Sequence, residues 1–140
     1  MPLLSVIMAS RDENIFFLHK CVESILNQTF SDFIFYIIIE VNDSNIQYFK
    51  DLSEKHKKVV LLINNKRPGV SMARNMGFYQ SKSKYVAIVD SDDFYNLNKF
   101  EKQINFLEKN KNICLVGSNL FLVDYRDNII GQRLYPEDHV

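Results

Sequence analysis

Tyr85-Val86-Ala87-Ile88-Val89-Asp90-Ser91-Asp92-Asp93 is the stretch that decides the fold. Its first five residues are apolar and largely favour β-structure, so they predict a short buried strand. This strand runs directly into three aspartates within four positions. Crowded carboxylates repel one another, so ionising all three is unfavourable unless a cation or hydrogen-bond donors lie among them. Acids after a buried strand suit a divalent cation and, through it, a polyphosphate. The plain alternative is that Asp92 or Asp93 caps the next helix and faces solvent.

Strand and helix patterns alternate along the rest of the chain. Apolar runs predict strands, and apolar residues three or four positions apart predict the helices between them. The predicted strands cover 3–8, 33–39, 59–63, 85–89 and 113–117. The predicted helices lie around 18–26, 46–56 and 100–107, and one more begins at 71 and carries Ala73 and Gly77 toward the sheet. The segments 120–123 and 129–130, joined by a turn, predict a C-terminal β-hairpin. The alternation predicts an α/β fold with a mostly parallel sheet, right-handed crossovers and helices on both faces.

The composition is that of a folded globular chain. Lysine plus arginine and aspartate plus glutamate both number 17, so the net charge gives no reason to expect nucleic acid as a partner. Hydrophobic residues make up 46% of the 140 residues, which argues against disorder, and we expect one domain covering 1–140. No apolar run approaches the roughly 18 residues of a membrane span. We therefore expect a cytoplasmic protein, and we leave a membrane-associated partner open.

The two cysteines lie far apart and form no CxxC pair. Cys21 falls on an apolar helix stripe and Cys114 in an apolar run, so we expect both to be buried free thiols.

Three polar loops follow predicted strands. Parallel sheets bind ligands beyond the carboxyl ends of their strands, so the loops 9–13, 40–44 and 90–93 are expected to meet in one cleft. Glu40 ends an apolar strand, where its carboxylate is able to accept a hydrogen bond from a uracil N–H or from ribose hydroxyls. The alternative for Glu40 is a solvated strand end.

The segment 67–77 predicts a helix start that suits an anion. Gly69 allows close approach of the backbone, and we expect Ser71 to be the N-cap. Free N–H groups at the helix start favour negative charge, and Arg74, one turn in, is able to reach a phosphate or to fix one of the acids. A capped helix with local pairing is the alternative. There is no Gly-rich phosphate loop, so the key feature of a dinucleotide-binding enzyme or a Walker-type kinase is missing.

At these residues the chain resembles the family 2 glycosyltransferases, inverting enzymes of the GT-A fold that use nucleotide-diphosphate sugars. Four blocks in the family's order and spacing carry the resemblance, and they are 24–33, 69–77, 85–93 and 99–103. The block 24–33 looks like the family's first helix and the entry to its second strand, and the block 69–77 looks like its helix after the third strand. The block 85–93 looks like the family's strand with the DxD motif, and 99–103 like the helix that follows it. The resemblance covers essentially the whole chain and implies a GT-A (Rossmann-like) sheet.

The resemblance also implies roles for single residues. Asp90 would contact the ribose or the metal, and Asp92 would coordinate Mn²⁺ or Mg²⁺ bridging the diphosphate. Glu40 matches the acid that recognises the base, and Ala9 and Arg11 match the loop that packs on the nucleoside. The implied partners are a nucleotide-diphosphate sugar, expected to carry UDP, and a glycan or lipid-linked acceptor in the synthesis of a surface polysaccharide or similar glycan.

Gly69 and Arg74 join this set as expected nucleotide-sugar-binding residues. Two departures from the family concern the nucleoside site. The family often has Pro-x-Tyr-Asn where this chain has Ala9-Ser10-Arg11-Asp12, and the family's Asp-Asp at the strand end is replaced here by Ile39-Glu40. An inverting mechanism also needs a general base. In the family this base lies well beyond the DxD motif, in the acceptor-binding half. We expect the chain to be truncated before that half, so its catalytic residue is unknown.

Three other interpretations stay open at this point. The first is a truncated remnant that holds a nucleotide without turnover. The second is a nucleotidyltransferase-like α/β domain, which shares the sheet and the acids but normally brings a basic Gly-rich loop after its first strand. The third is a structural partner protein with no metal-dependent ligand. Oligomerisation is open as well, since a missing half leaves an apolar face to be covered.

Overall fold

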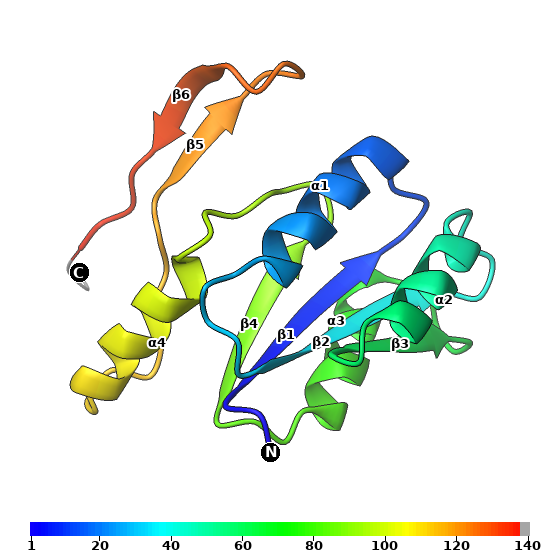
Figure 1. The fold of residues 1–140 in the computed structure, drawn as a ribbon, viewed down its shortest axis with the longest axis horizontal. Helices are drawn as coiled ribbons and strands as arrows, with labels where there is room; N and C mark the ends of the chain where they lie inside the picture. The colour runs from blue at the N-terminus through cyan, green and yellow to red at the C-terminus, as the bar shows by residue number, and fades with distance from the viewer. Residues whose placement is uncertain (138–140) are drawn as a thin grey trace. The chain divides into compact units, whose positions relative to one another are not determined.

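The computed structural model describes residues 1–137 and divides into two compact units, the first ending at Lys102 and the second beginning at Gln103 (Figure 1). The first contains a four-stranded parallel sheet in the order β3-β2-β1-β4. Its strands are β1 (Leu4–Ser10), β2 (Phe33–Glu40), β3 (Val59–Asn64) and β4 (Tyr85–Asp90). Its helices are α1 (Ile15–Leu26), α2 (Ile46–Lys55) and α3 (Val70–Gln80), and α4 (Lys99–Lys109) begins in this unit and continues into the second.

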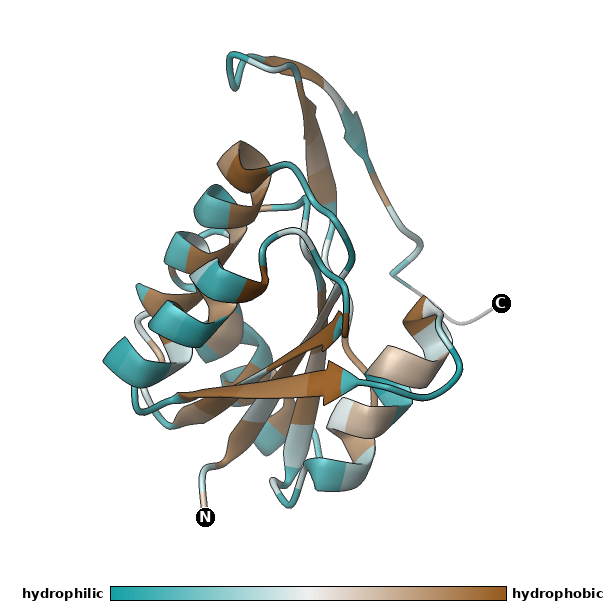
Figure 2. Ribbon diagram, turned by 90° about the vertical axis from the view of Figure 1, so that its right-hand side faces the viewer, coloured by the Kyte–Doolittle hydropathy of each residue, from teal (hydrophilic) through white to brown (hydrophobic). Residues whose placement is uncertain are grey.

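Helices cover both faces of the parallel sheet, as the sequence predicted. Successive side chains of a strand point to opposite faces. Ile7 of β1 packs with Ile38 of β2 and Ala73 of α3 on one face. Met8 lies on the other face, where its sulfur is 3.6 Å from the Cys21 sulfur of α1. The strands of the sheet carry hydrophobic colour between the helices in Figure 2, which is the pattern of a parallel sheet covered on both faces.

β4 differs from its prediction as a buried strand. It lies at the edge of the sheet and pairs with β1 alone among the described strands. Val89 is buried, but Ile88 is 48% exposed. An apolar run indicates that a segment forms a strand, but it carries no information on whether that strand is central or at an edge. Pairing with distant strands decides that.

Two local boundaries also differ from the predictions. Ala9 and Ser10 belong to strand β1 and not to the loop after it. α3 begins at Val70, so Ser71 lies inside the helix and is not its N-cap. Gly69 takes the N-cap position with φ 133°, a value that side chains with a Cβ rarely adopt, and it offers no side chain to cap the first turn. The backbone requirement at this position therefore outweighs the capping preference of serine.

The second unit contains the predicted hairpin, formed by β5 (Leu120–Val123) and β6 (Ile129–Arg133). The Asp124 carboxylate accepts hydrogen bonds from the N–H groups of Arg126 and Asn128 and so closes the turn. The predicted strand at 113–117 is wrong, because this segment pairs with no strand among residues 1–137.

The prediction that Cys114 is buried is wrong as well, whereas Cys21 is fully buried, as expected. An apolar run becomes a strand only when another strand offers hydrogen-bond partners, and Cys114 lies in a run without them. The single-domain expectation for 1–140 stays a prediction. In the part of the chain that the structure covers, no helix is both long enough and apolar enough to cross a membrane.

Candidate functional site

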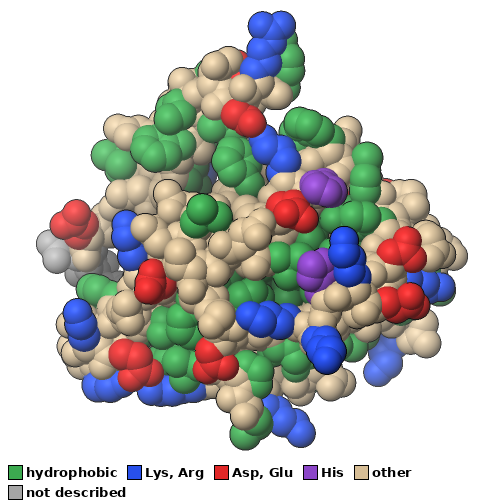
Figure 3. Space-filling view, in the orientation of Figure 1, with side chains coloured by type: hydrophobic (Ala, Val, Ile, Leu, Met, Phe, Trp, Pro, Cys, Tyr) green, Lys and Arg blue, Asp and Glu red, His purple; other side chains and the backbone are tan. Residues whose placement is uncertain are grey.

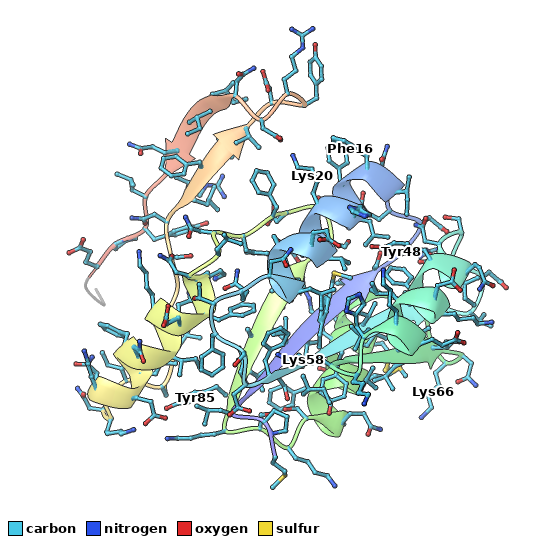
Figure 4. The ribbon with its side chains drawn as sticks, in the orientation of Figure 1. Phe16, Lys20, Tyr48, Lys58, Lys66 and Tyr85 are labelled. Carbon is cyan, nitrogen blue, oxygen red and sulfur yellow. The ribbon has the colours of Figure 1, made fainter. Side chains whose placement is uncertain are left out.

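A polar pocket of about 300 Å³ lies at the carboxyl ends of β1, β2 and β3. Its lining includes Arg11, Glu40, Asn64 and Lys66. In Figure 4, Lys66 lies just beyond the carboxyl end of β3. A second hollow of about 160 Å³ is lined by Ala9 and Gly69, and it shares Arg11 and Glu40 with the first. The structure thus brings the loop after β1 and the loop after β2 together, at the edge of the sheet where the sequence predicted a cleft.

The Glu40 carboxylate is held by two groups from the β3–α3 region. Its Oε1 accepts from the Gly69 N–H at 3.2 Å, and both oxygens lie 3.2–3.3 Å from Asn64 Nδ2. Asn64 is buried, and its amide also donates to the Arg67 carbonyl and accepts from the Lys66 N–H. Glu40 therefore fixes the start of α3 while its carboxylate lines the pocket.

Two aspartates join the first two loops reciprocally. The Asp12 N–H donates to Asp43 Oδ2 at 3.0 Å, and the Ser44 N–H donates to Asp12 Oδ1 at 2.8 Å. Asp43 is 3% exposed and also accepts from the Asn45 N–H. The hydrogen bonds from Ser44 hold the pKa of Asp12 below its ordinary value. We call Asp12 and Asp43 the loop clasp; it sets the spacing between the loops that carry Arg11 and Glu40.

The acid turn, residues 90–93, follows β4. Arg74 of α3 pairs with Asp90, with Nη2 and Oδ1 2.5 Å apart, so Arg74 fixes one of the acids. The Asp93 N–H reaches the Asp90 carbonyl and closes the turn. Asp92 and Asp93 are exposed, whereas Ser91 is buried and its hydroxyl donates to Glu13 of the loop after β1. The acid turn is thereby joined to the first loop, although it lines neither pocket.

The acids of the turn are close enough to influence one another and a neighbouring thiol. Partial burial and the charges of Asp92 and Asp90 raise the pKa of Asp93. Burial, together with the same acids, raises the pKa of Cys21 to about 12, so this thiol stays protonated at neutral pH. Added positive charge at the turn would relieve the repulsion between the acids.

No group of three or more His, Cys, Asp or Glu side chains within residues 1–137 forms a ready-made metal cage. An ion at the acid turn would therefore take further ligands from water or from a bound anion. Acidic and basic side chains are interspersed on the face shown in Figure 3, without a large surface of one sign.

The residues singled out from the sequence fall into two neighbouring groups. Ala9, Arg11, Glu40 and Gly69 line the hollows, and the other group is the Arg74–Asp90 pair with the exposed Asp92. α3 links them, because its Ala73 lines the smaller hollow and the next residue bonds Asp90.

Sequence reasoning did not identify Asn64 or the loop clasp. Asn64 ends a strand, and the two aspartates lie in turn-rich loops. Such positions indicate a turn, but they do not reveal that Asn64 bonds Glu40, 24 positions away, or that Asp12 bonds Asp43, 31 positions away.

Comparison with known proteins gives one consistent result. The model of the glycosyl transferase family 2 matches residues 5–133. The chain is 34% identical over 140 residues to an uncharacterized glycosyltransferase of Methanocaldococcus jannaschii, and the match covers 99% of this chain and 48% of that protein. It is 28% identical over 135 residues to WfgD of Escherichia coli, a UDP-Glc:α-D-GlcNAc-diphosphoundecaprenol β-1,3-glucosyltransferase, with 96% of this chain and 52% of that protein covered. The chain thus spans about half the length of both relatives.

A solved structure shows the same fold. The mannosyltransferase PcManGT of Pyrobaculum calidifontis, determined with GDP-Man and Mn²⁺, superposes with a TM-score of 0.68 at 16% identity. The superposition covers 76% of this chain and 32% of that one. The parallel sheet with helices on both faces is therefore of the GT-A type, as expected.

Proposed function

The chain belongs to glycosyl transferase family 2, and on this basis we propose that it provides the donor-binding half of an enzyme that transfers a sugar from a nucleotide-diphosphate sugar with inversion. The proposed nucleotide is UDP, and the proposed acceptor is a glycan or a lipid-linked sugar of a cell-envelope polysaccharide. WfgD, whose name records UDP-Glc and a diphosphoundecaprenol-linked acceptor, supports both choices. A lipid-linked acceptor would place the reaction at the inner face of the membrane, with the chain on the cytoplasmic side.

The observation that carries this proposal is the placement of the acid turn beside the smaller hollow, which shares Arg11 and Glu40 with the polar pocket. Arg74 and Asp90 are paired, and the next residue toward the start of α3 lines the smaller hollow. A nucleoside in the hollows would lie against Ala9 and Arg11. Glu40 would contact its nucleobase, and Gly69 would lie beside it at the start of α3. The diphosphate would then extend toward Asp90 and Asp92.

The acid turn fits a divalent cation by the chemistry of its donors. Its side chains offer carboxylate oxygens, which Mg²⁺ and Mn²⁺ prefer. Burial raises the pKa of Asp93, and so do the charges of Asp92 and Asp90; a cation would relieve the repulsion between these acids. Mg²⁺ commonly takes one or two carboxylates together with substrate phosphates, so a complete protein cage is not required. PcManGT, solved with Mn²⁺, supports the choice of ion.

Asp92 would hold the cation, and Asp90 would either share it or contact the ribose. When bound, the cation would stabilise the negative charge that develops on the departing nucleoside diphosphate. Arg74 keeps the Asp90 carboxylate oriented through its bond to Oδ1. The N–H groups in the first turn of α3, which no N-cap side chain covers, add partial positive charge beside the phosphates.

Calorimetric titration of UDP into the 140-residue chain, first with Mn²⁺ and then with EDTA, tests the proposal. We expect binding in Mn²⁺ and a loss of at least tenfold in affinity in EDTA. Absence of binding under both conditions would refute a donor site in this chain.

The same titration tests the assignment of Asp92. Asp92→Asn removes one negative ligand from an exposed position, so we expect it to abolish the Mn²⁺-dependent part of UDP binding without changing the thermal midpoint. Asp51→Asn on α2 is the matched control, because Asp51 is also exposed but lies on another element. Unchanged Mn²⁺-dependent binding in Asp92→Asn would exclude Asp92 as a metal ligand.

A further inference from the structure

The hydroxyl of Tyr95 makes two hydrogen bonds with the backbone of a single residue, Asp90. It accepts from the Asp90 N–H at 2.9 Å and donates to the Asp90 carbonyl at 3.2 Å. In an antiparallel β-sheet, the residue directly opposite on the neighbouring strand exchanges this pair of bonds. Because β4 is an edge strand, the Tyr95 side chain takes the place of a neighbouring strand at the last residue of β4.

Tyr95 is itself fixed to α1. Its N–H donates to Ser24 Oγ at 3.1 Å, and the Ser24 hydroxyl donates to the Cys21 carbonyl at 2.7 Å. One residue further on, the Asn96 carbonyl accepts from Gln28 Nε2 at 2.8 Å. The segment after the acid turn is therefore attached to the last turn of α1 and to Gln28 just beyond it, and the phenol ring has little freedom to move away from β4.

Asp90 is held at its backbone and at its side chain. Its carbonyl accepts from the Cys21 thiol at 3.2 Å as well as from Tyr95, and its carboxylate is paired with Arg74. These bonds fix where β4 stops and the acid turn begins.

We propose that Tyr95 is a positioning residue of the donor site, whose hydroxyl fixes the backbone at Asp90 and so sets the direction in which Asp90 and Asp92 face a metal–diphosphate ligand. This inference rests on the proposed function. Tyr95 touches neither pocket, and it acts through Asp90. Without the hydroxyl, the Asp90 N–H loses its acceptor and the Asp90 carbonyl loses one of its donors at the point where the turn starts, so the acids would sample several orientations.

Tyr95→Phe tests the inference, because it removes the hydroxyl and keeps the ring. In Mn²⁺ we expect the affinity for UDP to fall about tenfold, as the loss of a doubly bonded hydroxyl implies. In EDTA we expect Tyr95→Phe and wild type to bind equally weakly, because the hydroxyl acts on the acids alone. Tyr79→Phe is the matched control, since Tyr79 is 83% exposed on α3, and it should bind like wild type in both conditions.

A second readout does not depend on the ligand. In the ¹H–¹⁵N spectrum of the unliganded chain, we expect the Asp90 amide resonance to move in Tyr95→Phe and to stay in place in Tyr79→Phe. If Tyr95→Phe folds poorly, Ser24→Ala removes the anchor of the Tyr95 N–H and should weaken Mn²⁺-dependent binding in the same direction, by a smaller factor.

The outcomes separate the inference from the proposed function. Wild-type affinity in a folded Tyr95→Phe variant would overturn the inference and leave the donor site standing. An equal loss of affinity in Mn²⁺ and in EDTA would also overturn it, because it would reveal a general packing role. A wild-type chain that binds no UDP in Mn²⁺ would refute the proposed function itself, and the inference with it.

Discussion

Glu40 shows at the scale of a single residue how one side chain serves the fold and the pocket together. Its carboxylate accepts from Gly69 and Asn64, and it lines both hollows. The sequence left two interpretations for Glu40, a ligand-binding acid or a solvated strand end. The structure adds a third role, in which Glu40 ties the end of β2 to the start of α3. That role required a partner 29 positions away, which no local pattern reveals.

Glu40→Gln is expected to have two effects. In wild type, Asn64 Nδ2 bonds both carboxylate oxygens of Glu40. The substitution replaces one of these oxygens by an NH₂ group, which cannot accept from Asn64. The loss of this hydrogen bond should lower the free energy of unfolding by about 1 kcal/mol. The affinity for UDP should fall, and the preference for UDP over GDP should narrow. Urea unfolding and paired titrations with UDP and GDP measure these effects.

Glu54→Gln is the control for this substitution, because Glu54 is an exposed glutamate of α2. It should change neither the stability nor the affinity. An unaltered preference for UDP in Glu40→Gln would remove Glu40 from the base site.

At the scale of elements, the loop clasp couples the ends of β1 and β2. Asp12 has φ 49°, a conformation that aspartate and asparagine tolerate better than most residues. The hydrogen bonds of Asp12 and Asp43 fix this loop conformation from both sides. Parallel strands deliver their following loops to the same edge of the sheet, so the clasp is a direct consequence of the β1–β2 pairing.

The clasp predicts a pH dependence of stability. The pKa of Asp12 is lower in the folded chain than its ordinary value of 3.8, so its carboxylate stabilises the fold above that pH. This contribution is lost as the pH falls through the lower, folded pKa. Asp12→Asn carries no titrating group at this site. Its difference from wild type in the free energy of unfolding should be constant above about pH 5 and shrink below about pH 4. A difference that does not vary with pH in urea unfolding would show that the Asp12 charge has no part in the clasp.

The packing of α3 on the sheet depends on Gly77. A Cβ at this position would lie 2.7 Å from Ile7 Cγ2 and 2.8 Å from Ile38 Cδ1. Gly77→Ala gains helix propensity, but overpacking costs more, so we expect a net loss of about 1–2 kcal/mol in the free energy of unfolding. Gly117→Ala is the control, because nothing lies within 4 Å of a Cβ there, and its effect should stay within about 0.5 kcal/mol. Equal stabilities of the two variants would contradict this contact.

At the scale of the whole molecule, the two units differ in how much apolar surface they bury. The strands β1 and β2 contain most of the fully buried side chains, whereas Phe121, Ile129 and Ile130 of the hairpin are more than 60% exposed. A two-stranded hairpin is marginally stable in water on its own. Exposed apolar surface of this kind is typical of an interaction site. The expectation that a partner or a second copy covers an apolar face stays a prediction.

Hydrogen exchange should reveal this difference between the units. We expect the amides of β5 and β6 to exchange much faster than those of β1 and β2, because local opening of a solvated hairpin costs little free energy. Mass spectrometry after short deuterium pulses measures both. Hairpin amides as protected as those of β1 would contradict the prediction, and loss of that protection on tenfold dilution would identify self-association as its cause.

The sequence by itself determined the local elements and the residue types at the site. Apolar periodicity reports burial within one segment, so it located all four parallel strands and their helices. The abrupt change from Val89 to the acids located the turn. The position of Arg74 one turn into α3 left two partners open, a phosphate or one of the acids, and the structure pairs it with Asp90.

Tertiary structure alone decided which distant residues meet. It placed β4 at an edge of the described sheet, left 113–117 without a partner strand among residues 1–137, and joined Asp12 to Asp43 and Tyr95 to Ser24. The physical reason is that strand order and register bring together loops that are far apart in the sequence. Backbone N–H and carbonyl groups at a sheet edge also form hydrogen bonds with side chains of the loop that follows. Local sequence carries the preference of each segment, but the identity of its partner is set when the sheet assembles.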